Sequence, residues 1–383
     1  SITSAAGDLI SVERTPESYT LTLQDSSMAG NLSLGGTDEA DTINLEGTHS
    51  SFNFKVYGGT GDDVITIGNN LAGENRLYGM DGNDEIRGGN GTDHIYGDLV
   101  NGEEAWSGDD LIYGGGGKDF LYGQGGADQL YGEDGNDRIL GGEGDDVLYG
   151  GAGQDILRGG TGADVIHGGD GDDHIFGDQG ADIMSGGAGQ DWFDGGAGID
   201  TISYAAATGA VQIRLDYTLA KENGVIEQVE NIENATGSAF DDFIVGDDLD
   251  NVLRGGSGND TIYGGDGNDV IYGGDGVDNM YGQGGADTFV FESVTAFNNY
   301  NPIRDFNEGE GDLLDISDLL EGYDPLSDAI EDFVIATDTG YGSTQISVDA
   351  NGGADNYQAV PVLYGVTEIT DLAALVNNGE AIV

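Results

Sequence analysis

Cysteine is absent from the 383-residue sequence, proline occurs four times, and basic side chains are scarce: 11 lysines and arginines face 72 aspartates and glutamates. Without cysteine, disulfides and thiol chemistry are excluded. The formal net charge of −61 makes binding to DNA, RNA or an anionic lipid surface unfavourable. No apolar run reaches membrane-spanning length. We therefore expect no nucleic-acid partner and no membrane span.

Two kinds of motif are also missing. Residues 1–30 contain no basic segment followed by an apolar one, as a cleaved signal peptide would. The chain starts at Ser1 rather than at methionine, which leads us to expect a piece or a processed form of a longer protein. Neither HExxH nor GxSxG occurs, so the zinc-protease and serine-hydrolase signatures are absent and we expect no catalytic residues.

Glycine, by contrast, is abundant, with 72 residues, and it is strictly periodic. Residues 114–203 read as ten consecutive nonapeptides, from GGGGKDFLY to GGAGIDTIS. Each follows Gly-Gly-x-Gly-x-Asp-x-U-x, where U is a large apolar residue and the second glycine can be replaced. Units of the same period occur over residues 58–113 and 237–290. Such a strict period indicates a repeat architecture rather than a disordered glycine-rich tract.

Each nonapeptide divides into a six-residue turn and a three-residue strand. Side chains alternate in direction along a strand, so the eighth residue points opposite to its two neighbours. That position is always apolar in the ten units, and we expect it to form the core: Leu121, Leu130, Ile139, Leu148, Leu157, Ile166, Ile175, Met184, Phe193 and Ile202. Two units make one coil, with a strand on each side. The predicted fold is all-β, a parallel β-roll.

The aspartate at the sixth position is the candidate metal ligand. Glycines at the turn allow positive φ and bring carbonyl oxygens together beside this carboxylate. An oxygen-only cage of flexible geometry favours Ca²⁺ over Mg²⁺ or a transition metal, and each ion would lie between turns of successive coils. The predicted ligands are Asp63, Asp84, Asp93, Asp110, Asp119, Asp128, Asp137, Asp146, Asp155, Asp164, Asp173, Asp182, Asp191, Asp200, Asp260, Asp269, Asp278 and Asp287.

The energetics point to a fold that depends on many bound Ca²⁺ ions. Burying one large apolar side chain per repeat yields about 1.5–3 kcal/mol. Ordering nine residues costs on the order of 10 kcal/mol, and the carboxylates repel each other along the stack. Bound cations would replace this repulsion by coordination, so that binding free energy becomes folding free energy. Extracellular calcium, in the millimolar range, would saturate such sites.

Breaks in the period suggest five segments. We expect an N-terminal β cap at 1–57, a first roll block at 58–203, a β excursion at 204–236, a second block at 237–290 and a C-terminal cap at 291–383. Metal binding is left open at three departures from the pattern: Asn75, the glycine-poor units of 237–254, and the insertion within Gly97–Tyr113.

The cap segments carry their own patterns. Strands are expected in the N-terminal cap at Tyr19–Leu23, Asn31–Leu34 and Phe52–Val56. In the C-terminal cap, residues 312–320 are expected to form a short helix with Asp312 as its N-cap. Strands should follow at 333–335 and 345–348, and a last helix at 370–377.

The GGxGxDxUx blocks resemble the RTX exoproteins of Gram-negative bacteria, whose hemolysin-type repeats bind calcium. The segments Ala286–Phe291, Ile303–Phe306 and Gly311–Leu320 resemble the C-terminal secretion region of large RTX adhesins. For this chain the resemblance implies export by the type I secretion apparatus through an uncleaved C-terminal signal. It also implies folding on external Ca²⁺ and a secreted or cell-surface location. The expected function is a non-enzymatic, calcium-folded module for the secretion and extension of a larger adhesin.

Two alternatives stay open. One is the C-terminal repeat module of a secreted RTX enzyme such as an epimerase, protease or lipase. The other is a carbohydrate-binding surface, and a glycan or other cell-surface ligand could also bind through upstream domains. Tyr113, Tyr131 and Tyr149 are spaced two units apart, as are Tyr263 and Tyr281, and we expect each set to stack as a ladder. Cross-strand aromatic pairing explains these ladders without a ligand.

Overall fold

The computed structural model divides the chain into two compact units, Ser1–Asp200 and Thr201–Val383, and each is described by itself. It describes residues 10–15, 18–23, 29–37, 39–47, 51–98, 100–101, 104–105, 107–292, 301–320, 330–349, 357–364 and 366.

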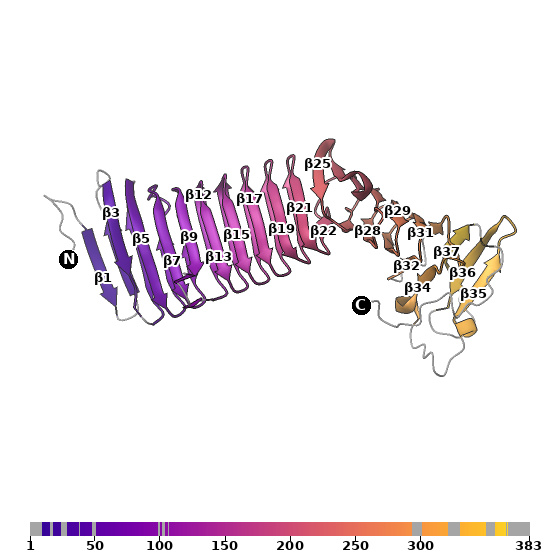
Figure 1. Cartoon of the computed structure of the whole chain (residues 1–383), viewed down its shortest axis with the longest axis horizontal. Helices are drawn as coiled ribbons and strands as arrows, with labels where there is room; N and C mark the ends of the chain where they lie inside the picture. Colours follow the sequence, from indigo (N-terminus) through magenta and orange to yellow (C-terminus); the bar gives the residue numbers. More distant parts are fainter. Residues whose placement is uncertain are drawn as a thin grey trace. The chain divides into compact units, whose positions relative to one another are not determined.

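The first unit is built from two stacks of short strands (Figure 1). Sheet A contains β1 (Ile10–Thr15), β2 (Ser18–Leu23), β4 (Thr42–Gly47), β6 (Val64–Ile67), β8 (Glu85–Arg87), β12 (Leu111–Gly117), β14 (Gln129–Gly135), β16 (Val147–Ala152), β18 (Val165–Asp170) and β20 (Ile183–Ala188). Sheet B contains β3 (Ala29–Gly35), β5 (Ser51–Thr60), β7 (Asn75–Asp81), β9 (Asp93–Asp98), β13 (Phe120–Gly125), β15 (Arg138–Glu143), β17 (Ile156–Thr161), β19 (His174–Gly180) and β21 (Trp192–Gly198). The chain alternates between the sheets and so completes one coil every two strands.

Neighbouring strands pair in parallel throughout both sheets, except that β1 pairs antiparallel with β2. In the regular part the register advances by two nonapeptides, as in Ile112↔Leu130↔Leu148. The predicted N-terminal strands are confirmed as parts of β2, β3 and β5. Parallel stacking therefore begins at β2 and β3, ahead of the regular repeats that start at Gly58.

The core of the first unit is the predicted row of eighth-position side chains. All of those that lie in this unit, from Leu121 to Phe193, are at most 2 % exposed. In β14, β16 and β18 the residues on either side of the inward one are half-buried or exposed, as the pleat requires. The prediction of an all-β parallel β-roll is confirmed.

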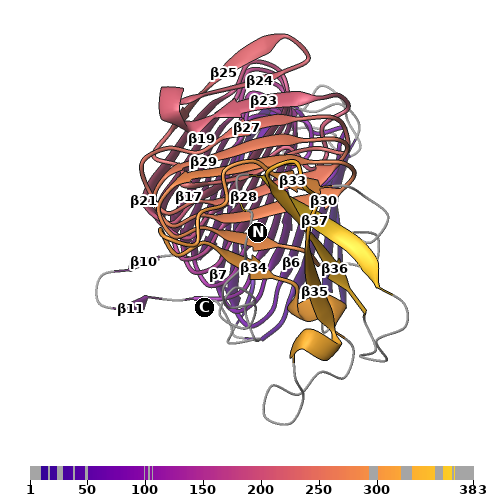
Figure 2. The same ribbon diagram turned by 90° about the vertical axis from the view of Figure 1, so that its right-hand side faces the viewer.

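The insertion between Gly97 and Tyr113 forms a two-stranded antiparallel hairpin, β10 (Val100–Asn101) and β11 (Glu104–Ala105). It projects from one edge of the stack (Figure 2). Strand β12 nevertheless pairs in register with both β8 and β14, so the insertion leaves the coil intact. A solenoid accommodates extra residues in this way, as a loop from one turn.

The second unit repeats the two-sheet plan. One sheet contains β22 (Thr201–Ser203), β26 (Asn234–Thr236), β28 (Val252–Ser257), β30 (Val270–Asp275), β32 (Thr288–Val290) and β34 (Leu313–Asp315). The other contains β23 (Val211–Arg214), β27 (Phe243–Val245), β29 (Thr261–Asp266), β31 (Asn279–Gly284), β33 (Asn301–Ile303) and β37 (Gln358–Tyr364). These neighbours also pair in parallel.

The break in the period at 204–236 corresponds to extra structure at one coil. After β23 the chain forms a 3-10 helix at Leu215–Tyr217 and an antiparallel hairpin of β24 (Leu219–Glu222) and β25 (Val225–Glu230). Strand β22 still pairs directly with β26, and β23 with β27. Within this unit, the excursion is therefore an insertion that the stacked coils bypass.

The C-terminal part corrects one prediction. Residues 312–320 do not form a helix that Asp312 caps: Leu313–Asp315 is strand β34, with Leu314 fully buried, followed by a 3-10 helix at Ser317–Leu319. The strands expected near 333 and 345 are β35 (Val334–Asp338) and β36 (Ser343–Val348), after a 3-10 helix at Ile330–Asp332. Strands β35, β36 and β37 form an antiparallel meander. The helix predicted at 370–377 lies outside the described residues.

The predicted tyrosine ladders are confirmed. The rings of Tyr113, Tyr131 and Tyr149 stack at 4.9 Å between centroids, and Tyr263 and Tyr281 stack at 4.4 Å. A further ladder on sheet B joins Tyr57, Tyr78, Tyr96 and Tyr122 at 4.8–5.0 Å. Because each inner ring face lies against a neighbouring ring, it is not free to stack on a sugar. The ladders thus act first as cross-strand packing.

Candidate metal sites

The eighteen predicted aspartates lie at equivalent places, at the end of a turn and directly before a strand. None of them is more than 2 % exposed. Ionised carboxylates are almost never buried in this way without a partner. The turns thus concentrate buried negative charge along both edges of each roll.

One carboxylate oxygen of each aspartate is used to join successive coils. The backbone N–H of Asp110 donates to Oδ1 of Asp128, that of Asp128 to Asp146, and that of Asp146 to Asp164, each at 2.8 Å. All eighteen predicted aspartates accept an equivalent hydrogen bond through Oδ1, from a backbone N–H of the preceding turn, at 2.6–3.1 Å. They are Asp63, Asp84, Asp93, Asp110, Asp119, Asp128, Asp137, Asp146, Asp155, Asp164, Asp173, Asp182, Asp191, Asp200, Asp260, Asp269, Asp278 and Asp287. Two aspartate rows result in each unit, one along each edge.

The other oxygen, Oδ2, is buried and has no hydrogen-bond partner in the described part of the chain at most of these positions. They are Asp63, Asp84, Asp93, Asp110, Asp119, Asp128, Asp137, Asp146, Asp155, Asp164, Asp173, Asp182, Asp260, Asp269 and Asp278. A buried acceptor left unpaired costs about 1–3 kcal/mol, and more when it is charged. A periodic set of such atoms calls for a common partner.

Carbonyl oxygens of the next coil face the same space. A methyl group placed on Gly114, the first residue of its turn, would lie 2.6 Å from Oδ2 of Asp119 and 2.9 Å from the carbonyl oxygen of Gly132, one coil further on. The first-position glycines at 79, 97, 123, 132, 141, 150, 168, 177, 255 and 264 have the same two neighbours. Glycine is required there because any side chain would displace both oxygens.

The second and fourth turn positions bend the backbone toward this arrangement. In the turn of Asp119, Gly115 and Gly117 have φ of 104° and 131°. Even where another residue replaces the second glycine, as at Gln124 and Glu133, φ stays positive at 82° and 72°. Positive φ is a strained backbone conformation for residues other than glycine. The geometry of the turn therefore overrides the conformational preference of the residue.

Burial raises the pKa of the row aspartates well above the ordinary value of 3.8. The pKa of Asp146 rises to about 8 and that of Asp110 to about 9, first through burial and then through repulsion from neighbouring row carboxylates. Those of Asp119, Asp137 and Asp173 rise to about 7 for the same reasons. A cation at the turn would remove this penalty by compensating the charge.

The donor set of the turns fits a hard cation. No group of three or more His, Asp or Glu side chains in metal-binding geometry occurs among the described residues, so carboxylates alone do not make a site. One buried carboxylate oxygen per turn together with backbone carbonyls makes an all-oxygen set, which suits Ca²⁺.

At the three departures from the repeat pattern, namely the insertion, Asn75 and the glycine-poor units, the rows continue with different residues. The insertion leaves Asp110 in its row, with Oδ1 bonded to the N–H of Asp84 at 2.8 Å. Asn75 takes a row position with its amide oxygen, which accepts from the N–H of Phe54 at 3.0 Å. In the glycine-poor units, Asn251 and Asp242 also occupy row positions.

Several row members escaped the sequence prediction. Asp242 is the sixth residue of its unit, which strict use of the period would have found. Asp41 belongs to a degenerate unit, and Asp312 follows Asp287 by 25 residues, yet both bond in the rows. Asp98 is fully buried beside the insertion; its Oδ1 has no partner among the described residues, and burial raises its pKa to about 7.

A second ladder, formed by fifth-position side chains, was also missed. Here Oδ1 accepts from the backbone of the following coil: the N–H of Ala127 donates to Asp109 at 2.9 Å and that of Ala163 to Asp145 at 2.8 Å. In the second unit Asn259 and Asn268 bond to Asp241 and Asp250 in the same way, at 2.7 Å. The enrichment of Asp and Asn at the fifth position was the available signal.

Comparison with known proteins identifies the repeat. A family model described as the RTX calcium-binding nonapeptide repeat (4 copies) matches residues 71–102, 107–130, 131–166, 167–202, 236–271 and 254–289. No curated protein matches the chain. Among solved structures, the extracellular lipase LipA from Serratia marcescens is similar at 20% identity over 59% of this chain and 40% of the lipase chain, with a TM-score of 0.26. The match thus spans well under half of the lipase, and it carries no argument about function.

Proposed function

This chain is an RTX-repeat protein, and on that premise we propose that it is a non-enzymatic module whose rolls fold when external Ca²⁺ binds to the turns. The observation that carries the proposal is the periodic set of buried Oδ2 atoms without partners in the described part of the chain, most of them next to a carbonyl oxygen of the following coil. In this proposal the eighteen row aspartates of the repeats are the ligands. Each ion bridges two turns, so binding and coil stacking are one process.

The test is a calcium titration of the full chain, followed by far-UV circular dichroism and by size-exclusion chromatography. Added Ca²⁺ converts an expanded chain into a compact β-rich state, and Mg²⁺ at the same concentration does so far less because it demands a tighter octahedral shell. A chain that is already compact and β-rich in chelator contradicts the proposal.

We further propose that this module serves the export and extension of a larger adhesin of a Gram-negative bacterium, secreted or held at the cell surface. Two features support this. The segments around Ile303–Phe306 and Gly311–Leu320 resemble the secretion region of RTX adhesins. In addition, a chain that folds only where calcium is plentiful stays unfolded in the cytosol, which passage through the type I secretion apparatus requires. Any glycan or cell-surface ligand would bind through upstream domains.

The export role is tested by deleting residues 291–383. The truncated chain remains inside the producing cell, and its repeats need more Ca²⁺ to fold, because β33, β34 and β37 no longer cover the last coils. Secretion that survives the deletion removes the export role. Unchanged calcium dependence removes the template role of the cap. A variant with Tyr341→Ser, which alters a 93 % exposed side chain of the same segment, serves as the control.

A further inference from the structure

Four row positions differ from the interior of the rows in one respect: their second side-chain atom already has a donor or acceptor of its own. They are Asp41 and Asn75 in the first unit and Asp242 and Asn251 in the second. The same holds for Asp312 at the last described turn of its row, where Oδ2 accepts from the N–H of Asn307 at 2.8 Å. In the described part of each unit, Asp41, Asn75 and Asp242 are each the first carboxylate or amide of a row, whereas Asn251 follows Glu233, which directly precedes β26. We name the first four the closed turns, and the turns with an unpartnered Oδ2 the open turns.

At two closed turns a hydroxyl residue at the second turn position satisfies the aspartate. Oδ2 of Asp41 accepts from the backbone N–H of Thr37 at 2.5 Å and from its hydroxyl at 2.9 Å. Oδ2 of Asp242 accepts from the N–H and the hydroxyl of Ser238 at 2.5 and 2.9 Å. Two donors aimed at one carboxylate oxygen satisfy it without a cation.

The backbone at these two turns differs accordingly. Open turns such as those of Asp119 and Asp128 have positive φ at the second position, at Gly115 and Gln124. Thr37 and Ser238 lie outside that left-handed region, and their N–H groups face the carboxylate. At Asp41 and Asp242 the second turn residue therefore satisfies the carboxylate oxygen from within the turn.

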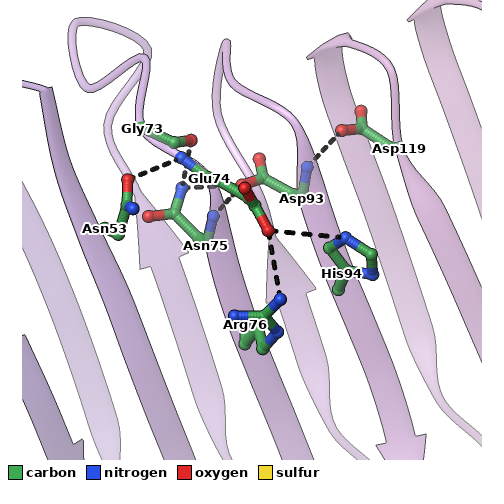
Figure 3. Close-up of polar contacts among 8 residues, drawn as sticks. All are labelled: Asn53, Gly73, Glu74, Asn75, Arg76, Asp93, His94 and Asp119. Carbon is green, nitrogen blue, oxygen red and sulfur yellow. Dashed lines mark hydrogen bonds and ion pairs between the residues drawn. The ribbon is translucent and has the colours of Figure 1, made fainter. Parts of the chain in front are cut away.

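At the other two closed turns an asparagine replaces the aspartate, and its NH₂ group bonds to oxygens around the turn. Nδ2 of Asn75 donates to Oδ1 of Asp93 at 2.6 Å and to the carbonyl oxygen of Gly73 at 3.3 Å (Figure 3). Nδ2 of Asn251 donates to the carbonyl oxygen of Glu233 at 2.7 Å and to Oδ1 of Asp247 at 3.2 Å. An NH₂ group is a donor only and cannot ligate a cation, so oxygens that would face an ion face the amide instead.

We propose that the closed turns take no Ca²⁺ and are held together without it, whereas the open turns depend on it. The proposal rests on calcium binding by the open turns and specifies where that binding stops. Its physical basis is the hydrogen bonding of the closed turns: the side-chain atom that would face an ion already has a partner. Donors from Thr37, Ser238 or an asparagine amide take over the role of the cation there.

The test removes, one closed turn at a time and in the full chain, the donor that occupies the place of the cation. Asn75→Asp and Asn251→Asp each replace the amide donor by a carboxylate oxygen, and each is expected to add one bound Ca²⁺ per chain in isothermal titration calorimetry. Asn259→Asp is the matched control, because it adds the same charge at an exposed fifth position outside the rows, and it leaves the stoichiometry unchanged. Ser238→Gly is expected to add one ion at Asp242.

The outcomes separate this proposal from the proposed function. A wild-type chain that binds no Ca²⁺ overturns the proposed function. A wild-type chain that binds Ca²⁺, with the same stoichiometry in both asparagine variants, overturns the closed turns alone. If the variants do not fold, anomalous diffraction from wild-type crystals grown with Ca²⁺ decides. Ions in the open turns and none beside Asp41, Asn75, Asp242 or Asn251 support the proposal, whereas an ion at any of these four contradicts it.

Discussion

The repeat turns of 114–200 and the meander of β35–β37 bury side chains in opposite ways. In the meander Val334, Ile346, Val348, Val360 and Val362 are at most 1 % exposed, and antiparallel pairing places Val334 directly opposite Val348. In the repeats each nonapeptide buries one apolar side chain and one carboxylate. The first arrangement is a conventional hydrophobic core, whereas the second adds buried charge at every turn.

The difference shows which part of the chain is stabilised by apolar burial alone. Apolar burial in the meander is favourable without any ligand. In the repeats the gain from one Leu or Ile is offset by an unpaired, buried carboxylate oxygen. On the proposed function, the repeats therefore fold under the control of cation concentration, whereas the meander does not.

Chelation should have the largest effect. In EGTA the amides of β12 to β21 are expected to lose hydrogen-exchange protection by several orders of magnitude, while those of β35 to β37 keep theirs. The measurement is exchange followed by mass spectrometry, with and without Ca²⁺. Loss of protection in both regions at the same calcium concentration would show that the meander depends on the roll.

Acidification in chelator should partly substitute for calcium. The folded-state pKa values of Asp110, Asp146 and Asp173 lie at about 9, 8 and 7, above the ordinary 3.8. A raised folded-state pKa contributes stability that is fully present below the unfolded value and is lost as pH rises through the folded one. Without Ca²⁺, β structure is thus greater near pH 5 than near pH 9. Circular dichroism across this range checks it, and the opposite slope would contradict the buried rows.

Truncating the core should come next in size. Leu148→Ala removes a fully buried eighth-position side chain and is expected to lower the free energy of unfolding in saturating Ca²⁺ by about 2–5 kcal/mol. Leu140, at a ninth position and 36 % exposed, is the matched control, and Leu140→Ala should change it by less than about 1 kcal/mol. Denaturant titration measures both. Equal effects would place the core elsewhere.

Glycine substitutions should give the smallest but most local contrast. A methyl group on Gly132 would meet Oδ2 of Asp137 and the carbonyl oxygen of Gly150, so Gly132→Ala should cost about 1–3 kcal/mol and raise the Ca²⁺ midpoint. At Gly340, with φ of 76° and nothing within 4 Å, alanine meets only backbone strain of about 1 kcal/mol. Its effect should not depend on Ca²⁺. A calcium-independent loss at Gly132 would argue against a cation beside that turn.

The period alone predicts most of the roll. The apolar residue at the eighth position of every nonapeptide fixes which side chains point inward, from Leu121 to Phe193. The aspartate at the sixth position fixes which carboxylates align in rows. The sequence could also have placed Asp242, because it keeps the sixth position even though its turn lacks glycines. For these elements local spacing and tertiary register carry the same information, since each coil contacts only its neighbours.

Outside the regular nonapeptides, the period does not predict which residues of neighbouring strands pair. At 312–320 the residues favour a helix start locally, yet Leu314 completes a sheet beside Phe289, and this long-range pairing overrides the local preference. The sequence marks Asn75 and the units of 237–254 as departures from the pattern, but it does not predict that Oδ2 of Asp41 or Asp242 is satisfied within its own turn. Whether Thr37 or Ser238 directs its N–H at a carboxylate depends on backbone torsions, which the residue type does not determine.

The tyrosine ladders have an optical consequence. Rings stacked at 4.8–5.0 Å, as along Tyr57, Tyr78, Tyr96 and Tyr122, are close enough for excitation energy to pass from one to the next before emission. The ladder exists only when successive coils are stacked in register. Because the rings are held nearly parallel, at 6–14° between planes, the tyrosine signal in near-ultraviolet circular dichroism is expected to change as coils assemble and to be lost as they separate. The chain carries, in its own side chains, a spectroscopic record of how many coils are in place.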